Sequence, residues 1–520
     1  MSMVLQLLAR SPSAIHLDDA TVDAAGLAAD GEHLARSLHR DGLEPGDRVA
    51  LWCANGLPYL RTLAGVAAAR LVLVSVNTRF APDEARSIIE RSGARLLITD
   101  QPTDRQPPGL PVVAAADVER LVTEGASLPA APSEAAAHHP DDPFAVFTTS
   151  GTTSKPKLVL HTQRSIVEHA NDVPGPFGYG PHTRMLQALP LCGVFGLCCL
   201  TAAVAAGAQI WLPSRFDAEG ASALVARQRI DTTNAPDDMI HRMLATGQDL
   251  SSLDLVGYGR FNSSLTDIVE RAEAAGVNLT GLYGMSEVQA LYLLQDPTLP
   301  TPLRARAGGA PVSDRAAARV VDPDTGSRVA TGDDGELQLR GPSLFAGYLA
   351  EGGAGIDPEL TASAHAVDDE GRRWFRTGDL ARPEPDGTFT FLTRMGDVLR
   401  LGGFLVSPAE IEDVLITCDG IAEAQVVAVA RPEGVRPVAV VIPDGPIDVN
   451  AVQATCGQRL ARYKVPVRVV EVSAFPVTAS ANGTKIQRHR LQELAAAALA
   501  DDDQTGEHQA GAGPARIRRP

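Results

Sequence analysis

The sequence is short of several residue types, and each shortage excludes a class of protein. It has 46 Lys and Arg against 63 Asp and Glu, which gives a formal net charge of -17. So acidic a chain lacks the positive field that attracts nucleic acid or an anionic membrane, and we expect neither as a partner. Six cysteines in 520 residues are too few for a disulfide framework. They favour a reducing compartment, so we predict a cytoplasmic protein.

Membrane-directed segments are also missing. The first ten residues contain no basic start followed by a sustained apolar run, so no signal peptide is predicted. Residues 190–213 carry no charged side chain and are long enough to cross a bilayer. However, Gly193, Gly196 and Gly207 interrupt this segment. We therefore predict a buried helix flanked by strands, and no integral membrane segment.

The patterns that are present predict an α/β fold. Apolar runs such as 48–53 and 71–76 alternate with helical patterns such as 57–70. This alternation predicts largely parallel sheets. From 317 to 392, short strands separated by Gly, Pro and Asp turns predict a small β-rich subdomain, and an α+β pattern follows Arg394.

One stretch suggests a phosphate-binding loop. Residues 148–157 read Thr-Thr-Ser-Gly-Thr-Thr-Ser-Lys-Pro-Lys and follow a short apolar run. Hydroxyls and backbone N–H groups can surround phosphate oxygens, and lysine adds positive charge. A flexible Ser/Thr-rich linker is the alternative. A Walker A loop is a poor alternative, because no glycine stands at its second required position.

A second stretch, 283–287, reads Tyr-Gly-Met-Ser-Glu. The aromatic ring can stack on a purine, and the glycine permits close approach of the backbone. The carboxylate of Glu287 can hold Mg²⁺ beside phosphates. By itself the pentapeptide is equally compatible with a loop that carries a solvated glutamate.

These stretches and four others follow one another in the order typical of a known family. The others are 335–348, 374–380, 393–404 and 476–485. Together they resemble the adenylate-forming (AMP-binding) superfamily, in its acyl-CoA synthetase branch, over about residues 20 to 495. Some positions depart from the usual pattern: Ser154, Leu158 and Thr393 replace glycines, and Thr484 separates Gly483 from Lys485.

The resemblance implies a domain organisation. It predicts a large N-terminal domain with several subdomains and mostly parallel sheets (1–393), which binds ATP and the acid. A hinge (394–398) connects it to a small mobile α+β C-terminal domain (399–497). The polar end of the chain, 498–520, lacks periodicity and is predicted to be disordered.

The resemblance also implies the site residues. Lys485 and Glu287 are the predicted catalytic residues, Glu287 as the Mg²⁺ ligand, and Asp397 is the hinge residue. Lys464 is the nearest alternative to Lys485. The predicted ATP-binding residues are Thr149, Ser150, Gly151, Thr152, Thr153, Lys157, Tyr283, Gly284, Met285, Ser286, Asp379 and Arg394. The predicted acid pocket is Gly193, Val194, Phe195, Pro236 and Gly259, and the predicted coenzyme A site is Gly402, Gly403 and Phe404.

The implied reaction has two steps and three substrates. ATP, with Mg²⁺, activates a small carboxylic acid as an acyl-AMP, and a thiol then displaces AMP. Between Asp379 and Arg394 there is no room for the insertion that often marks carrier-protein loading, which favours coenzyme A as the thiol. Two alternatives stay open: an enzyme that loads a carrier protein, and a non-catalytic nucleotide-binding relative. The acid itself, aliphatic or aromatic, is not specified by the sequence, nor is the oligomeric state.

Overall fold

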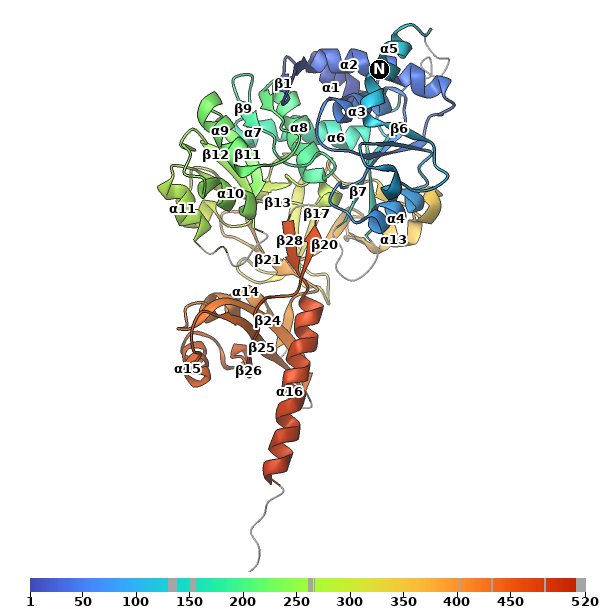
Figure 1. The fold of residues 1–520 in the computed structure, drawn as a ribbon. Coiled ribbons are helices and arrows are strands. Elements are labelled where there is room, and N and C mark those ends of the chain that lie inside the picture. Colours follow the sequence, from blue (N-terminus) through green and yellow to red (C-terminus); the bar gives the residue numbers. More distant parts are fainter. Residues whose placement is uncertain are drawn as a thin grey trace, which may run out of the picture.

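The computed structural model describes residues 1–129, 138–149, 156–260, 265, 267–401, 404–431, 434–480 and 483–510. Figure 1 shows a large body that contains the N-terminus and a smaller one that contains the C-terminal helix. A seven-stranded sheet lies on one side of the large body. Its order is β18 (Gly347–Tyr348), β8 (Leu158–Thr162), β7 (Pro143–Thr148), β4 (Val72–Ser75), β3 (Arg48–Trp52), β5 (Leu96–Thr99) and β6 (Val112–Ala114).

The second sheet of the large body has 14 strands. Its parallel section is β13 (Leu279–Tyr283), β12 (Leu255–Gly259), β11 (Thr232–Pro236), β9 (Arg184–Leu186), β10 (Gln209–Trp211) and β1 (Ala14–His16), and β2 (Thr21–Asp23) closes that edge. The antiparallel section is β14 (Leu293–Leu294), β15 (Gly308–Pro311), β21 (Phe389–Arg394), β20 (Arg373–Pro383), β17 (Gly335–Arg340) and β16 (Ala317–Val321), with β19 (His365–Val367) beside β20.

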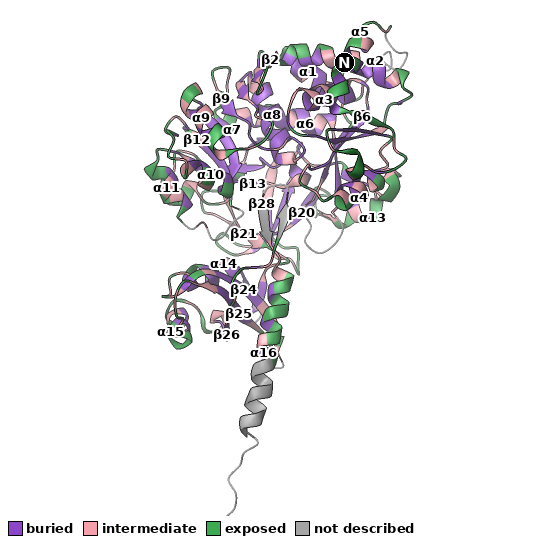
Figure 2. Cartoon of the chain, viewed as in Figure 1, coloured by how far each residue is buried: buried purple, intermediate pink, exposed green. Residues whose placement is uncertain are grey.

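Helices cover these sheets and form the main core with them. They are α1 (Met3–Arg10), α2 (Ala24–Arg40), α3 (Leu57–Ala68), α4 (Pro82–Ser92), α5 (Val118–Ala126), α6 (Gln163–Asp172), α7 (Pro174–Phe177), α8 (Val194–Ala206), α9 (Ala218–Gln228), α10 (Asp237–Leu244), α11 (Ile268–Ala274), α12 (Thr301–Arg304) and α13 (Pro358–Ser363). The predicted buried helix within 190–213 is confirmed as α8 between β9 and β10, and Figure 2 shows buried residues along it. Gly31 lets α2 approach α3, because a Cβ there would lie 2.7 Å from that of Ala64.

The small body has its own core around a three-stranded sheet. Strands β24 (Ile421–Arg431), β25 (Gly434–Pro443) and β26 (Arg468–Glu471) form this sheet. The accompanying elements are β22 (Leu399–Leu401), β23 (Phe404–Val406), α14 (Pro408–Leu415), α15 (Val449–Arg459) and the hairpin β27 (Val477–Ser480) and β28 (Gly483–Ile486). Figure 1 shows this hairpin extending from the small body to the level of β20 and β21 in the large one.

The last helix differs from the sequence-based expectation. α16 spans Arg488–Ala510, although we predicted a disordered tail from residue 498. The alanines at 495–498 and 500 favour helix and explain why it passes the predicted boundary. The α/β fold class is confirmed. The exact domain limits and the hinge at 394–398 stay proposals.

Candidate active site

The base of the predicted phosphate loop is fixed by two hydrogen bonds between Thr149 and Lys157. The Thr149 N–H donates to the Lys157 carbonyl at 3.0 Å, and the Lys157 N–H donates to Thr149 Oγ1 at 3.0 Å. These bonds continue the antiparallel pairing of β7 with β8. Residues 150–155, which include Ser150, Gly151, Thr152 and Thr153, lie outside the described residues.

Glu287 lies beside this loop base and is almost fully buried. Its carboxylate accepts a hydrogen bond from the Tyr348 hydroxyl at 2.9 Å, and the Lys157 ammonium lies 4.6 Å from the centre of the same tyrosine ring. Burial raises the pKa of the Glu287 carboxyl. Tyr348 therefore links the predicted metal ligand to the predicted phosphate-binding lysine, a role that the sequence did not suggest.

The Tyr283 motif turns back sharply on itself. A Cβ at Gly284 would lie 1.6 Å from the carbonyl oxygen of Ala290, so only glycine fits this position. The Tyr283 hydroxyl donates to Asp379 Oδ2 at 2.6 Å. It also lies 3.7 Å from the sulfur of Met285. The structure thus brings together two motifs that lie 96 residues apart in the sequence.

Asp379 has one oxygen without a hydrogen-bond donor. Its Oδ1 is buried and receives no hydrogen bond from any described residue, and the Arg394 Nε lies 3.8 Å away, too far for one. Burial raises the pKa of Asp379 to about 6, against the opposing effects of Arg394 and Tyr283. An unsatisfied buried carboxylate oxygen is costly, and a bound ligand with hydroxyl donors would satisfy it.

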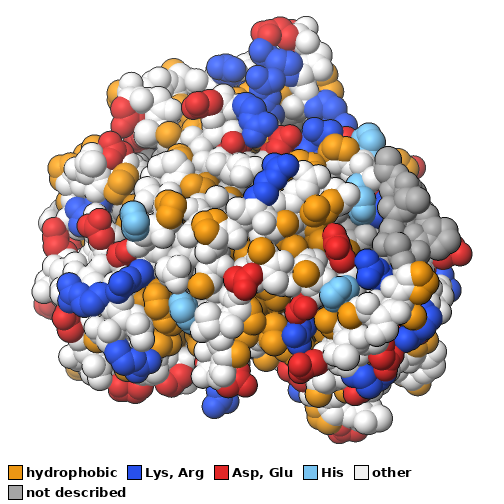
Figure 3. All heavy atoms as spheres, turned by 90° about the horizontal axis from the view of Figure 1, so that it is seen from above, with side chains coloured by type: hydrophobic (Ala, Val, Ile, Leu, Met, Phe, Trp, Pro, Cys, Tyr) orange, Lys and Arg blue, Asp and Glu red, His pale blue; other side chains and the backbone are white. Residues whose placement is uncertain are grey.

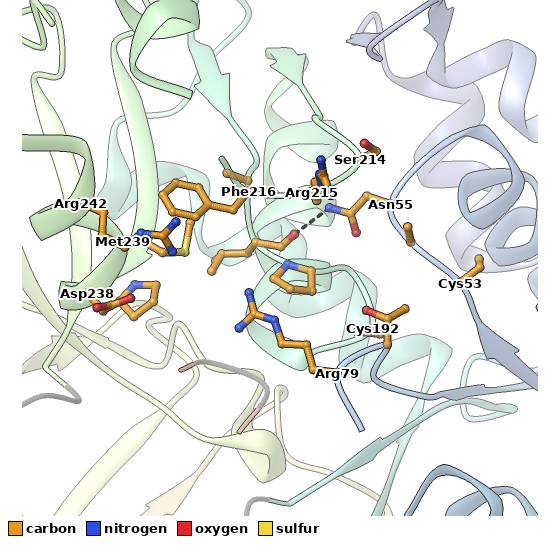
Figure 4. A pocket seen from close by; sticks show the side chains of 16 residues that line it. Cys53, Asn55, Arg79, Cys192, Ser214, Arg215, Phe216, Asp238, Met239 and Arg242 are labelled. Atoms are coloured by element: carbon orange, nitrogen blue, oxygen red, sulfur yellow. Dashed lines mark hydrogen bonds between the residues drawn. The ribbon is translucent and has the colours of Figure 1, made fainter. Parts of the chain in front are cut away.

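A cavity of about 260 Å³ opens near the carboxyl ends of several parallel strands. Arg79, Arg215 and Arg242 come from three separate segments and lie around it (Figure 4), together with one carboxylate, Asp238. Within the described ranges, none of the three arginines forms an ion pair, although Arg242 stacks 4.9 Å from the Phe216 ring. The cavity is therefore positively charged.

The predicted acid pocket overlaps this cavity in part. Pro236 lines it, and so does Cys192, the neighbour of Gly193. Gly193 caps the N-terminus of α8, which carries Val194 and the buried Phe195. Gly259 pairs with Pro236 across β11 and β12. The assignment of these residues to the acid stays a prediction.

Other predicted residues are placed only in part. Asp397 follows β21, and Arg488 Nε of α16 lies 3.9 Å from its Oδ2. Lys485 lies on β28, opposite Thr478 of β27, but its side chain is outside the described part of the chain. The same holds for Gly402 and Gly403, and for the side chain of Phe404.

Comparison with known proteins identifies the family. The family model described as "AMP-binding enzyme" matches residues 8–349, and that described as "AMP-binding enzyme C-terminal domain" matches 410–482. The chain belongs to the AMP-binding enzyme family. The predicted recognition is thus confirmed.

Relatives and solved structures match nearly the whole chain. The sulfoacetate–CoA ligase of Cupriavidus necator is 31% identical, and the alignment covers 89% of this chain and 91% of that protein. The 2-succinylbenzoate–CoA ligase of Bacillus licheniformis is 29% identical over 88% and 91%. The fold matches O-succinylbenzoate coenzyme A synthetase (MenE) from Bacillus subtilis in complex with ATP and magnesium, with a TM-score of 0.78 and 23% identity over 94% and 98%.

The donor set of this AMP-binding enzyme fits a magnesium ion that is held largely by nucleotide. Among the described residues, no group of three or more His, Cys, Asp or Glu side chains is arranged to hold a metal by itself. Mg²⁺ commonly binds through one or two carboxylates together with substrate phosphates. The single buried carboxylate of Glu287, next to the phosphate-loop base, matches that requirement.

None of the described helices is long and apolar enough to cross a membrane. The face of the large body seen in Figure 3 carries acidic and basic side chains interspersed, so its charge is spread out and does not form one basic stripe.

Proposed function

We propose that this AMP-binding enzyme activates a carboxylic acid with ATP and transfers the acyl group to coenzyme A. The observation that carries the proposal is the buried Oδ1 of Asp379, which receives no hydrogen bond from a described residue. The two vicinal hydroxyls of a ribose would donate to this carboxylate, and the neighbouring Glu287 and Lys157 would face the phosphates. The named CoA ligases among the relatives support the choice of reaction.

In the first step, an oxygen of the acid attacks the α-phosphorus of ATP, and the bond to pyrophosphate breaks. Asp379 would hold the ribose, while Lys157, Arg394 and the phosphate loop would offset the negative charge. Lys485 would lie between the acid's carboxylate and the α-phosphate. Mg²⁺ held by Glu287 would neutralise phosphate charge when it is bound. Phosphoryl chemistry of this kind depends mainly on positioning and on charge neutralisation.

In the second step, the thiol loses its proton and its sulfur attacks the acyl carbon, and AMP leaves. Both steps use the same acyl group, so Lys485 must withdraw before the thiol reaches it. A rotation of the small domain at Asp397 would achieve this, with Gly402, Gly403 and Phe404 then facing the thiol. The free cysteines and the use of ATP are consistent with the predicted cytoplasmic location.

The function is tested directly by pyrophosphate exchange. With a panel of acids that includes aliphatic and aromatic monocarboxylates, sulfoacetate and 2-succinylbenzoate, we expect labelled pyrophosphate to enter ATP only with a suitable acid and Mg²⁺. Addition of coenzyme A should then give acyl-CoA. If no acid supports exchange, the protein is a non-catalytic nucleotide-binding relative. If exchange occurs but only a carrier protein accepts the acyl group, coenzyme A is the wrong thiol.

The arginine-lined cavity supports coenzyme A as the thiol. Coenzyme A carries a 3′-phosphate and a diphosphate in addition to its pantetheine arm, and guanidinium groups bind phosphates well. The pantetheine arm of a carrier protein has only one phosphate. Three arginines that form no ion pair with a described residue therefore suit coenzyme A better than a carrier protein.

Removal of one of these arginines should weaken the binding of coenzyme A. An exposed guanidinium contributes roughly 1 kcal/mol, so we expect Arg79→Ala or Arg242→Ala to raise KM for coenzyme A about fivefold. Pyrophosphate exchange does not need the thiol, so it should change less than the KM for coenzyme A, although the cavity overlaps the predicted acid pocket. Arg10→Ala, at the exposed end of α1, is the matched control. Steady-state kinetics with coenzyme A and with pantetheine measure the effect, and an unchanged KM for coenzyme A in every cavity variant would place its phosphates elsewhere.

A further inference from the structure

The turn that carries Glu287 is held in an unusual backbone conformation. Gln289 and Ala290 have φ angles of 64° and 61°, in the left-handed region that favours glycine. Such a conformation costs on the order of 1 kcal/mol or more per residue and persists only where the surroundings impose it. The contacts around this turn show what imposes it.

Two buried histidines bind the turn on both sides of Glu287. His161, on β8, places its Nε2 2.8 Å from the carbonyl oxygen of Ser286. His169, on α6, places its Nε2 3.1 Å from the carbonyl oxygen of Gln289. A carbonyl only accepts hydrogen bonds, so in each ring Nε2 carries the proton and donates. Burial lowers the pKa of both imidazoles to about 4, so both rings are neutral at pH 7.

The side chain of Gln289 adds a third connection. Its amide donates to the carbonyl of Ser165 at 2.6 Å and to that of Ser343 at 3.2 Å. Ser165 lies on α6, the helix that also carries His169. The turn is thus fastened to β8 and α6, the two elements that directly follow the predicted phosphate loop.

We propose that His161 and His169 are positioning residues that hold the Glu287 turn against the phosphate-loop scaffold and so set the affinity for Mg²⁺ bound together with nucleotide. This inference rests on the proposed function, because it assigns Glu287 to the metal. Groups that orient a metal ligand are often nearly as important as the ligand, and their loss typically costs about 10- to 100-fold in metal affinity or activity.

The geometry suggests a pair of variants at each site. In a His→Gln variant the amide nitrogen occupies a place close to that of Nε2 and can still donate to the carbonyl. In a His→Asn variant the amide is one methylene shorter and does not reach it. Both replacements are polar and neutral, so the pair differs mainly in the hydrogen bond under test.

The measurement is the effect of Mg²⁺ on nucleotide binding, without turnover. The affinity for α,β-methylene-ATP, whose α–β bridge resists cleavage, is measured by calorimetry with Mg²⁺ and with EDTA. We expect Mg²⁺ to tighten binding to the wild type and to the Gln variants to a similar extent. In His161→Asn and His169→Asn the ratio of the affinity with Mg²⁺ to the affinity in EDTA should fall about tenfold or more. The affinity in EDTA itself should be unchanged.

The control is Ser37→Ala, which removes a buried hydrogen bond from Ser37 to the Leu121 carbonyl between α2 and α5. It should lower stability to unfolding without changing the Mg²⁺ gain. The positioning role would be overturned if Mg²⁺ increased nucleotide affinity equally in the Gln and Asn variants, whether by as much as in the wild type or by less. The proposed function would stay intact in either case. If the wild type itself binds the nucleotide without any Mg²⁺ gain, the assignment of Glu287 fails and this inference fails with it. If one Asn variant does not fold, the pair at the other histidine decides.

Discussion

Lys485→Ala should slow acyl-AMP formation by about 10²- to 10³-fold. This is the usual decrease in rate when one preorganised donor that stabilises the transition state is removed. The lysine ammonium would neutralise charge that accumulates as the acid's carboxylate approaches the α-phosphate. β28 carries Lys485 on a hairpin that extends toward β20 and β21 of the large body (Figure 1). The proposed function requires this hairpin to bring Lys485 to the nucleotide site in the first step and to carry it away with the small domain before the second.

The second half-reaction should be largely spared in the same variant. If the small domain rotates before the thiol enters, the lysine is absent from the site at that point. Preformed acyl-AMP supplied with coenzyme A should therefore restore turnover in Lys485→Ala. Single-turnover measurements of each half-reaction test this. Equal losses in both would contradict the rotation, and no loss in either would remove Lys485 from catalysis.

Lys464→Ala is the matched control for this experiment. The Lys464 ammonium forms an ion pair with Glu410 within the small body. Because its ammonium is already paired with Glu410, Lys464 is a poor candidate for the lysine that neutralises charge in the first step and then leaves the site. We expect adenylation in Lys464→Ala to stay near the wild-type rate. A large loss of adenylation in Lys464→Ala would instead assign the catalytic role to Lys464.

The sequence predicted most of the fold because each element carries its own pattern. The apolar runs 48–53 and 71–76 became the buried strands β3 and β4, and the uncharged segment became α8. The prediction of a disordered tail from residue 498 was wrong, because the alanines at 495–498 and 500 favour helix and α16 continues past that boundary. Local patterns of this kind need no knowledge of tertiary contacts.

The site was predictable only where a motif is contiguous. Tyr283, Glu287 and Asp379 were found from their motifs, and the contact between Tyr283 and Asp379 joins two of them. Tyr348 received no role in the site from its motif, because its contact with Glu287 joins residues 61 positions apart in the sequence. The three cavity arginines, two from loops and one from α10, share no local pattern either. One usable signal was that Arg79 closely follows a predicted strand, where ligand sites of α/β proteins gather.

Asp379→Asn should stabilise the free protein and weaken its binding of ATP. Burial raises the pKa of Asp379 from 3.8 to about 6, so its ionised form is disfavoured in the folded state. Between pH 4 and 6 the folded protein binds more protons at this residue than the unfolded chain. The free energy of unfolding therefore falls as pH rises through this range, by about 3 kcal/mol from this group, and stays lower above pH 6.

Asparagine cannot ionise, so Asp379→Asn should lack this fall and be more stable than the wild type at pH 7. Its amide oxygen can still accept the Tyr283 hydroxyl, which keeps the local packing. Urea titrations from pH 4.5 to 8 measure the difference between the two proteins. Asp333→Asn, an exposed residue between β16 and β17, should show no such change.

The affinity of Asp379→Asn for ATP should fall, although its stability rises. Hydrogen bonds to a charged group contribute about 1.5–3 kcal/mol, so we expect ATP to bind about 10- to 150-fold more weakly to Asp379→Asn at pH 8. In the wild type, affinity should decline as pH falls through about 6, because protonation removes the charge that the ribose hydroxyls would contact. Calorimetry across this pH range tests both statements. Unchanged affinity together with increased stability would show that the buried carboxylate serves some purpose other than holding the nucleotide.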